Sequence, residues 1–184
     1  MKKLSIILFF IVLGMSSICA QEHMKFMGKS MDCTMKQMQT HLEDRGFKYH
    51  AELHDGVYLK GPFQGYDDCI VGIYTRYGII SNCLVALPKT SNWSQIYTDY
   101  QKIVAKLTTK YGEPEIEEWF EDSDDLSEYG KMRQVRARQC HYEAYFFVDY
   151  GGIIVSIEPS ESIFISYFDD KNGELIKEKE FEEL

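Results

Sequence analysis

The stretch from Asn92 to Pro114, NWSQIYTDYQKIVAKLTTKYGEP, decides the fold because it contains a whole amphipathic helix with both of its end signals. Its large apolar residues recur at spacings of three and four, which places them on one helical face. Asn92 is an N-cap residue, and Gly112 with Pro114 marks the end. Burying this face contributes on the order of 10 kcal/mol before entropy is subtracted, so the helix must pack on a sheet. The face consists of Trp93, Ile96, Tyr100, Ile103, Leu107 and Tyr111.

A shorter helix is predicted upstream, over residues 35–45. Thr34 and Gln37 have the spacing of a capping box, and Gly46 supplies the left-handed residue that ends many helices. Met35, Met38 and Leu42 fall on one face of this helix. The two helix ends, at Gly46 and Gly112, lie about 65 residues apart, which indicates an internal repeat.

A meander of strands is expected after each helix. Alternation and turn signals place strands at 47–53, 57–60, 69–75 and 79–87 after the first helix, with Asp55-Gly56 as a hairpin turn. They place strands at 115–120, 133–149, 153–158 and 162–168 after the second, with 121–130 as an exposed acidic loop.

The predicted fold class is α+β, with two α-β4 units whose helices pack on antiparallel meander sheets. The units span residues 21–90 and 91–173, and residues 169–173 close the last strand. A charged tail, 174–184, follows as either a frayed segment or a short helix.

Residues 1–20 have the pattern of a cleaved secretory signal peptide. Lys2 and Lys3 give a positive start, an apolar run follows, and small residues lead to a cleavage site after Ala20. The run is about half the length that spans a bilayer, so membrane insertion after cleavage is not expected. An alternative is lipidation of Cys19, which the bulky Ile18 before it disfavours. The protein is therefore expected in the periplasm or outside the cell.

The charge of the chain excludes some partners. Cleavage takes the formal net charge from −9 to −11, because Lys2 and Lys3 leave with the signal. This disfavours nucleic acid and anionic membrane surfaces, whereas a basic protein or a cation remains compatible.

Neither a metal site nor a cofactor is predicted. Nine acids and no base occupy residues 113–128, and Asp122, Asp124, Asp125 and Glu128 carry oxygens of the kind that bind calcium. The central glycine and regular spacing of an EF-hand are missing, so we expect a solvated loop paired with Lys131, Arg133, Arg136 and Arg138. His50 and His54 are expected to face solvent, because their four-residue spacing serves zinc only on a helix.

Four cysteines remain after cleavage: Cys33, Cys69, Cys83 and Cys140. An oxidising compartment favours one or two disulfides, and the alternative is four buried free thiols. If Gly78 takes the left-handed place in a three-residue turn, Val71 faces Cys83 and the two hairpin cysteines are only diagonal neighbours. A Cys69–Cys83 bond needs another register, so the connectivity stays open.

Both faces of the 69–87 hairpin are apolar. One face is expected to carry Val71, Ile73, Ile79, Cys83, Val85 and Leu87, and the other Ile70, Tyr74, Ile80, Leu84 and Ala86. One layer of helices covers only one of them. The second face is then either a partner-binding surface or buried against the other half of the molecule or a second copy.

The order of these elements, with Phe26-Met27-Gly28-Lys29, Arg45-Gly46-Phe47 and Lys60-Gly61-Pro62-Phe63, resembles uncharacterised exported proteins of Bacteroidetes. Their layout is similar to that of β-lactamase-inhibitor-protein-like domains. The resemblance covers roughly residues 24–172 and implies sheets placed side by side that present a concave face to a protein partner. It implies neither a catalytic residue nor β-lactamase inhibition.

The functional expectation is a noncatalytic protein-binding module: an inhibitor, immunity factor or accessory component. Aromatic residues anchor many interfaces, so Tyr58, Phe63, Tyr66 and Tyr74, near the tips of the meander, are the candidate contacts, although core packing explains each equally well. The sequence contains no nucleophile elbow, phosphate-binding glycine loop or H-E-x-x-H motif. The alternative is a small exported hydrolase or ligand-binding domain, and the oligomeric state is open.

Overall fold

The structure, a computed structural model, describes residues 22–53 and 56–183, so the predicted signal sequence, His54 and the first residue of the expected Asp55-Gly56 turn lie outside it. The first half contains β1 (Lys25–Phe26), β2 (Lys29–Ser30), α1 (Met35–Glu43), β3 (Lys48–Leu53), β4 (Gly56–Phe63), β5 (Tyr66–Arg76) and β6 (Ile79–Ala86). The second contains α2 (Trp93–Tyr111), β7 (Glu115–Phe120), α3 (Glu128–Ala137), β8 (Cys140–Val148), β9 (Gly151–Glu158), β10 (Ser162–Asp169) and α4 (Asp170–Glu182).

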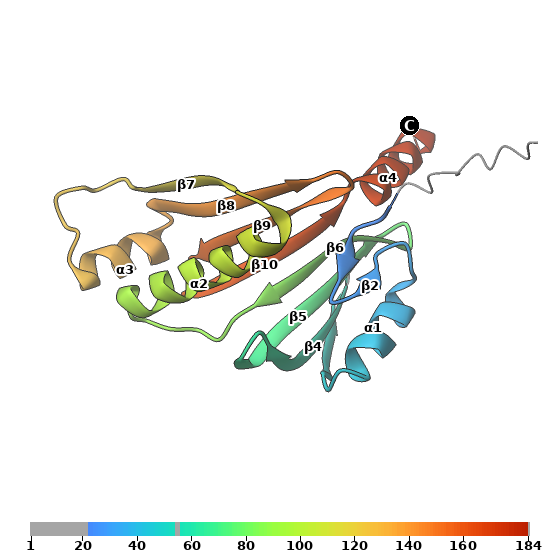
Figure 1. The fold of residues 1–184 in the computed structure, drawn as a ribbon, viewed down its shortest axis with the longest axis horizontal. Coiled ribbons are helices and arrows are strands. Elements are labelled where there is room, and N and C mark those ends of the chain that lie inside the picture. The colour runs from blue at the N-terminus through green and yellow to red at the C-terminus, as the bar shows by residue number, and fades with distance from the viewer. Residues whose placement is uncertain (1–21, 54–55, 184) are drawn as a thin grey trace, which may run out of the picture.

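The predicted α+β class, with a helix followed by four antiparallel strands in each half, is confirmed (Figure 1). The strands of both halves form one sheet in the order β3-β4-β5-β6-β10-β9-β8-β7. The junction is the antiparallel pairing of β6 with β10, which runs from Ala86↔Phe164 to Asn82↔Phe168. The last strand of the first unit therefore binds the last strand of the second.

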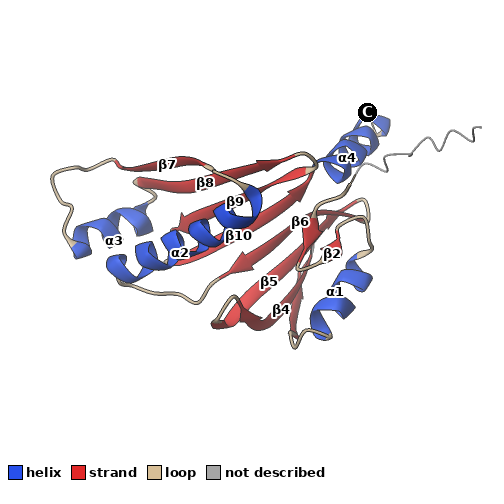
Figure 2. Cartoon of the chain, viewed as in Figure 1, coloured by secondary structure: helices blue, strands red, loops and turns tan. Residues whose placement is uncertain are grey.

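Both long helices pack on the same face of this sheet. One row of paired residues crosses six strands, and residues paired across strands share a face. This row is Leu59, Val71, Val85, Ile165, Val155 and Ala144, and each of them is at most 1% exposed. Helix α1 packs over β3–β5 and α2 over β8–β10. Figure 2 shows the two helices beside different halves of the sheet.

The predicted helix signals are confirmed at both ends. The Thr34 hydroxyl accepts from the backbone of Gln37 while the Gln37 side chain accepts from the backbone of Thr34. Asn92 caps α2 by accepting from the Gln95 N–H at 2.8 Å, and Gly46 and Gly112 both have positive φ. Trp93 and Ile103 are buried, as the amphipathic pattern requires. Among the described residues, no helix has the length and apolar character to cross a bilayer.

The register predicted for the 69–87 hairpin is wrong. Cys83 faces Ile73, and Val71 faces Val85. The turn contains two residues rather than three, because Tyr77 (φ 55°) joins Gly78 (φ 76°) in the left-handed region. An irregularity between Tyr74 and Thr75 then shifts the pairing by one more residue. As a result Ile80 lies in the core, and Ile79 is not buried.

The segment 121–149 differs from the expected loop and long strand, because α3 occupies Glu128–Ala137. Ser127 caps this helix, Met132 and Val135 are buried, and Gly130 lies so close to the Asp125 carboxyl that a Cβ would clash with it. The helix ends at Arg138 in the left-handed conformation, where the sequence has no glycine to mark the end.

The charged tail belongs to a helix that begins earlier than expected, at Asp170. Asp169, expected to close a strand, is its N-cap and accepts from the Asn172 N–H at 2.8 Å and the Met24 N–H at 2.7 Å. The buried Asn172 amide donates to Met31 O and Ile80 O. These bonds hold the N-terminal segment, which forms the unpredicted β1–β2 hairpin, against the end of the sheet.

A second buried polar residue, Glu161, fixes the connection between the halves. It lies in the β9–β10 turn, is 2% exposed, and accepts from Lys89 Nζ at 2.6 Å, from Ser91 Oγ at 3.1 Å and from Arg136. Its own carbonyl accepts from the Thr90 N–H. One carboxylate thus joins the β6–α2 connection and α3 to the turn.

Replacing Asn172 with Ala removes two buried hydrogen bonds, so we expect the free energy of unfolding to fall by about 2–3 kcal/mol. Urea unfolding followed by circular dichroism measures this loss. The control Glu174→Ala, at an exposed position of the same helix, should change stability by less than about 0.5 kcal/mol. Equal stabilities for the two variants would contradict the role of Asn172.

Glu161→Gln should lower stability by about 2 kcal/mol at pH 7, because the carboxylate loses its charge-assisted bonds. The bond from Lys89, with those from Arg136 and Ser91, lowers the pKa of the folded carboxyl against the opposing effect of burial. This stabilisation is complete above the unfolded pKa of about 4.3 and is lost as the pH falls through the folded pKa. The stability difference between wild type and variant should therefore shrink below about pH 4.3; a constant difference down to about pH 2.5 would refute it.

Candidate functional site

The face of the sheet opposite α1 and α2, called here the helix-free face, carries a second row of paired residues. Helix α4 lies at one end of the sheet rather than across this face (Figure 1). Most members of the row are half-buried, although their neighbours on the same strands are in the core. The row runs Tyr58, Gly72, Leu84, Ser166, Ile154, Tyr145 and Glu115, from β4 to β7.

The β4–β5 end of this face is built around Gly72. The Tyr58 and Tyr74 rings meet edge to face at 5.7 Å, and the Tyr58 hydroxyl donates to the Tyr74 hydroxyl at 3.1 Å. A Cβ at Gly72 would lie 2.8 Å from the Tyr74 ring, so the glycine makes room for the aromatic pair. This end is therefore a preformed aromatic platform.

The middle of the face is apolar and the β7–β9 end is acidic. Ile70, Leu84, Phe164 and Ile154 are half-buried in the middle, and Phe147 is 69% exposed. Because strand side chains alternate, the four glutamates of the far end project on the same side as the apolar row. They are Glu115, Glu117, Glu143 and Glu158, whereas the opposite end presents Lys48 and Lys60.

A histidine lies among these acids. His141 Nε2 is 3.0 Å from a Glu117 oxygen and 3.7 Å from a Glu143 oxygen, and its ring stacks on Trp119 at 5.6 Å. The Tyr145 hydroxyl donates to Glu143, and this hydrogen bond raises the pKa of Tyr145 to about 12. The acidic end thus holds an imidazole and an indole ring among its carboxylates.

The edges of the sheet are less suited to binding than its face. β3 and β7 are the edge strands. β7 carries Glu115, Glu117 and Glu118, whereas β3 carries Lys48 and Glu52. Charged side chains on an edge strand oppose its pairing with a strand of another chain. The helix-free face is therefore better suited than the edges to contact another molecule.

The four aromatic residues singled out from the sequence divide between two places. Tyr58 and Tyr74 come together on the helix-free face. Phe63 is buried, and the Tyr66 hydroxyl donates to Asp99 of α2 at 2.9 Å, so these two belong to the contact between the meander and α2. The residues of the acidic end, Tyr145, Phe147, Trp119 and His141, were missed. Their alternation along predicted strands was the available signal.

The acidic stretch of residues 113–128 and the histidines expected to face solvent show no sign of a metal site in the described part of the chain. Asp122 binds Arg133 at 3.1 Å, and Glu128 accepts from the Ser94 N–H at the start of α2. His50 is exposed, and His54 lies outside the described residues. Within residues 22–53 and 56–183, no cluster of His, Cys, Asp and Glu side chains has the geometry to hold a metal ion.

The four cysteines are free thiols in the structure. Cys69 and Cys83 are buried, and Cys33 and Cys140 are half-buried. Cys69 pairs with Gly61 rather than with Cys83, so the hairpin register does not bring these two face to face. Burial raises the pKa of Cys69 and of Cys140 to about 11 in each case, and it also raises those of Cys33 and Cys83.

No protein-family model, curated protein or solved structure matches this chain. Its own residues and their arrangement are therefore the basis for inferring its function.

Thiol alkylation should separate the four cysteines. At pH 8 the raised thiol pKa values keep the reactive thiolate scarce, so we expect slow labelling by iodoacetamide at the half-buried Cys33 and Cys140. The buried Cys69 and Cys83 should react only in denaturant. Peptide mass spectrometry measures each site. Rapid native labelling of Cys83 would contradict its burial, and any disulfide-linked peptides would be identified in the same digest.

Proposed function

We propose that this chain is an exported, noncatalytic protein-binding module that holds its partner on the helix-free face. The observation that carries the proposal is the row of half-buried apolar and aromatic side chains that crosses the sheet opposite both long helices. A contiguous apolar surface with a polar margin is typical of protein interfaces.

Charge defines the partner further. The acidic end of the face, with Glu115, Glu117, Glu143 and Glu158, favours a basic surface on the partner. The Tyr58–Tyr74 platform at the other end presents aromatic area at a small entropy cost, because the two rings already pack on each other. An inhibitor, immunity factor or accessory component would use such a preformed surface.

The signal sequence and the resemblance support this proposal independently. A cleaved leader would deliver the protein to the periplasm or the exterior. The resemblance to β-lactamase-inhibitor-protein-like domains implies binding through a sheet face.

A hydrolytic alternative has one observation in its favour, the approach of His141 to Glu117 and Glu143. A histidine with two carboxylates is part of many hydrolytic sites. Here the group lies on an open sheet face, and the Glu117 side chain is 61% exposed. No hydroxyl or thiol among the described residues hydrogen-bonds to His141, so the nucleophile of such a mechanism would have to come from elsewhere. Protein binding accounts for more of the face.

Affinity capture with matched variants tests the proposal. The mature protein should retain a stoichiometric partner from the envelope fraction of cells that produce it, and Phe147→Lys with Trp119→Lys should abolish retention, because both exposed aromatic residues border the acidic end. The control Tyr129→Lys, at an aromatic residue of α3 that is at least as exposed as either of them, should retain the partner.

Retention should also weaken with salt between about 0.05 and 0.5 M, because exposed charges are screened. Equal retention by the face variant and the control would refute the proposed surface. A retained small molecule without a protein would favour the ligand-binding alternative.

A further inference from the structure

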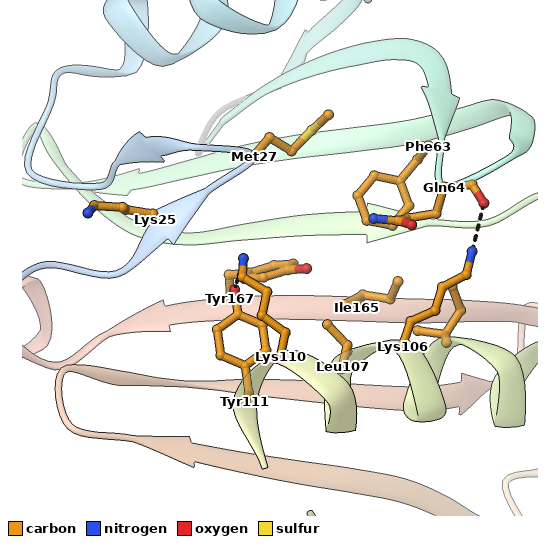
Figure 3. A pocket seen from close by; sticks show the side chains of 11 residues that line it. Lys25, Met27, Phe63, Gln64, Lys106, Leu107, Lys110, Tyr111, Ile165 and Tyr167 are labelled. Atoms are coloured by element: carbon orange, nitrogen blue, oxygen red, sulfur yellow. Dashed lines mark hydrogen bonds between the residues drawn. The ribbon is translucent and has the colours of Figure 1, made fainter.

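A pocket of about 130 Å³ lies on the helix side of the sheet, where the two halves of the chain meet. Residues of α2 and β10 form one wall, and residues of the β1–β2 hairpin and the β4–β5 turn form the other (Figure 3). Its floor is apolar. Phe63, Ile103, Ile165 and Tyr167 are each at most 7% exposed and belong to the core, and Leu107 packs beside them.

The rim of the pocket is positive in a chain whose net charge is −9. Three lysines, Lys25, Lys106 and Lys110, line it, and none of the lining residues is an Asp or a Glu. Within the described part of the chain no carboxylate forms an ion pair with any of the three. Lys106 and Lys110 are one turn apart on α2, a spacing at which like charges repel. Their ammonium groups point toward opposite ends of the pocket, that of Lys106 to Gln64 and that of Lys110 to Tyr111 (Figure 3).

The polar atoms at the rim are suited to an anion. Lys106 Nζ donates to Gln64 O across the pocket at 3.1 Å, and an ammonium has two further N–H groups to donate. Lys110 Nζ lies 2.8 Å from the Tyr111 hydroxyl. Tyr167 is only 7% exposed, yet its hydroxyl has no hydrogen-bond partner among the described residues. This hydroxyl points into the pocket (Figure 3). Burial raises the pKa of Tyr167, so this group remains a donor at neutral pH.

We propose that this pocket binds a small amphiphilic carboxylate, whose chain covers the apolar floor toward Lys106 and whose carboxylate accepts from Lys110 and the Tyr167 hydroxyl at the other end (Figure 3). The volume is below the 300–1,000 Å³ of sites that enclose drug-sized ligands, so the chain must be short. A hydrated anion without a chain, such as inorganic phosphate, would leave the floor uncovered. The pocket lies on the face opposite the proposed protein-binding surface, so the two proposals stand independently.

Titration calorimetry with octanoate as the probe tests this site. Wild-type protein at low ionic strength should bind octanoate with a Kd of about 1 mM or tighter, and should bind octanol and acetate at least about tenfold more weakly, because each lacks one half of the ligand. Lys106→Gln with Lys110→Gln should weaken octanoate binding about tenfold, and Tyr167→Phe about threefold. The control Lys177→Gln with Lys179→Gln removes the same charge from two exposed positions of α4 and should stay within about twofold of wild type.

Three results would overturn the proposal. If the pocket variant and the α4 control bind octanoate with equal affinity, only the overall charge of the protein matters. If octanol binds as tightly as octanoate, the rim does not recognise an anion. Amide chemical shifts locate the ligand: changes at Ile103, Leu107 and Ile165 are expected, and changes confined to the helix-free face would refute this pocket. Circular dichroism confirms that each variant is folded.

Discussion

The pairing of β6 with β10 is the constraint on which the other features depend. Taken alone, each α-β4 unit would leave the edge of its last strand unpaired, and unpaired backbone groups at such an edge bind another strand. Because the two last strands bind each other, the units share one sheet, and because Val85 faces Ile165 in that register, their apolar faces align. A shift by one residue would place one helix on the opposite side.

This junction also explains why the two faces differ in character. With α1 and α2 on one side, the other side keeps a row of half-buried residues that no long helix covers. On the helix side, a seam between the units holds the lysine-rimmed pocket, with α2 and β10 on one side and the β1–β2 hairpin and the β4–β5 turn on the other. Negative charge gathers on the helix-free face near β7 and positive charge at the seam, so an acidic chain presents two chemically distinct surfaces.

A few buried polar side chains secure the ends of this arrangement. Asp169 and Asn172 hold the N-terminal segment against the end of β10, and Glu161 holds the β6–α2 connection and α3 against the β9–β10 turn. Both sites lie at strand ends, where the backbone leaves the ladder and needs other partners. Their bonds link residues far apart in the chain, so they stabilise the joined molecule rather than either half.

Local sequence determined the helices and most strands. The capping residues of α1 and α2, their apolar spacing and the glycines after them act within one turn, and strand alternation acts between near neighbours. Local signals failed at α3, whose last turn ends on Arg138 rather than glycine, and at the β5–β6 turn, where Tyr77 takes a left-handed conformation. At both places tertiary contacts outweigh local preference. Only tertiary structure decided four features: the β6–β10 pairing, the contact of Tyr58 with Tyr74, the contact of His141 with Glu117, and the pocket. Each of them brings together residues whose relative positions depend on strand register and on chain segments far apart in sequence.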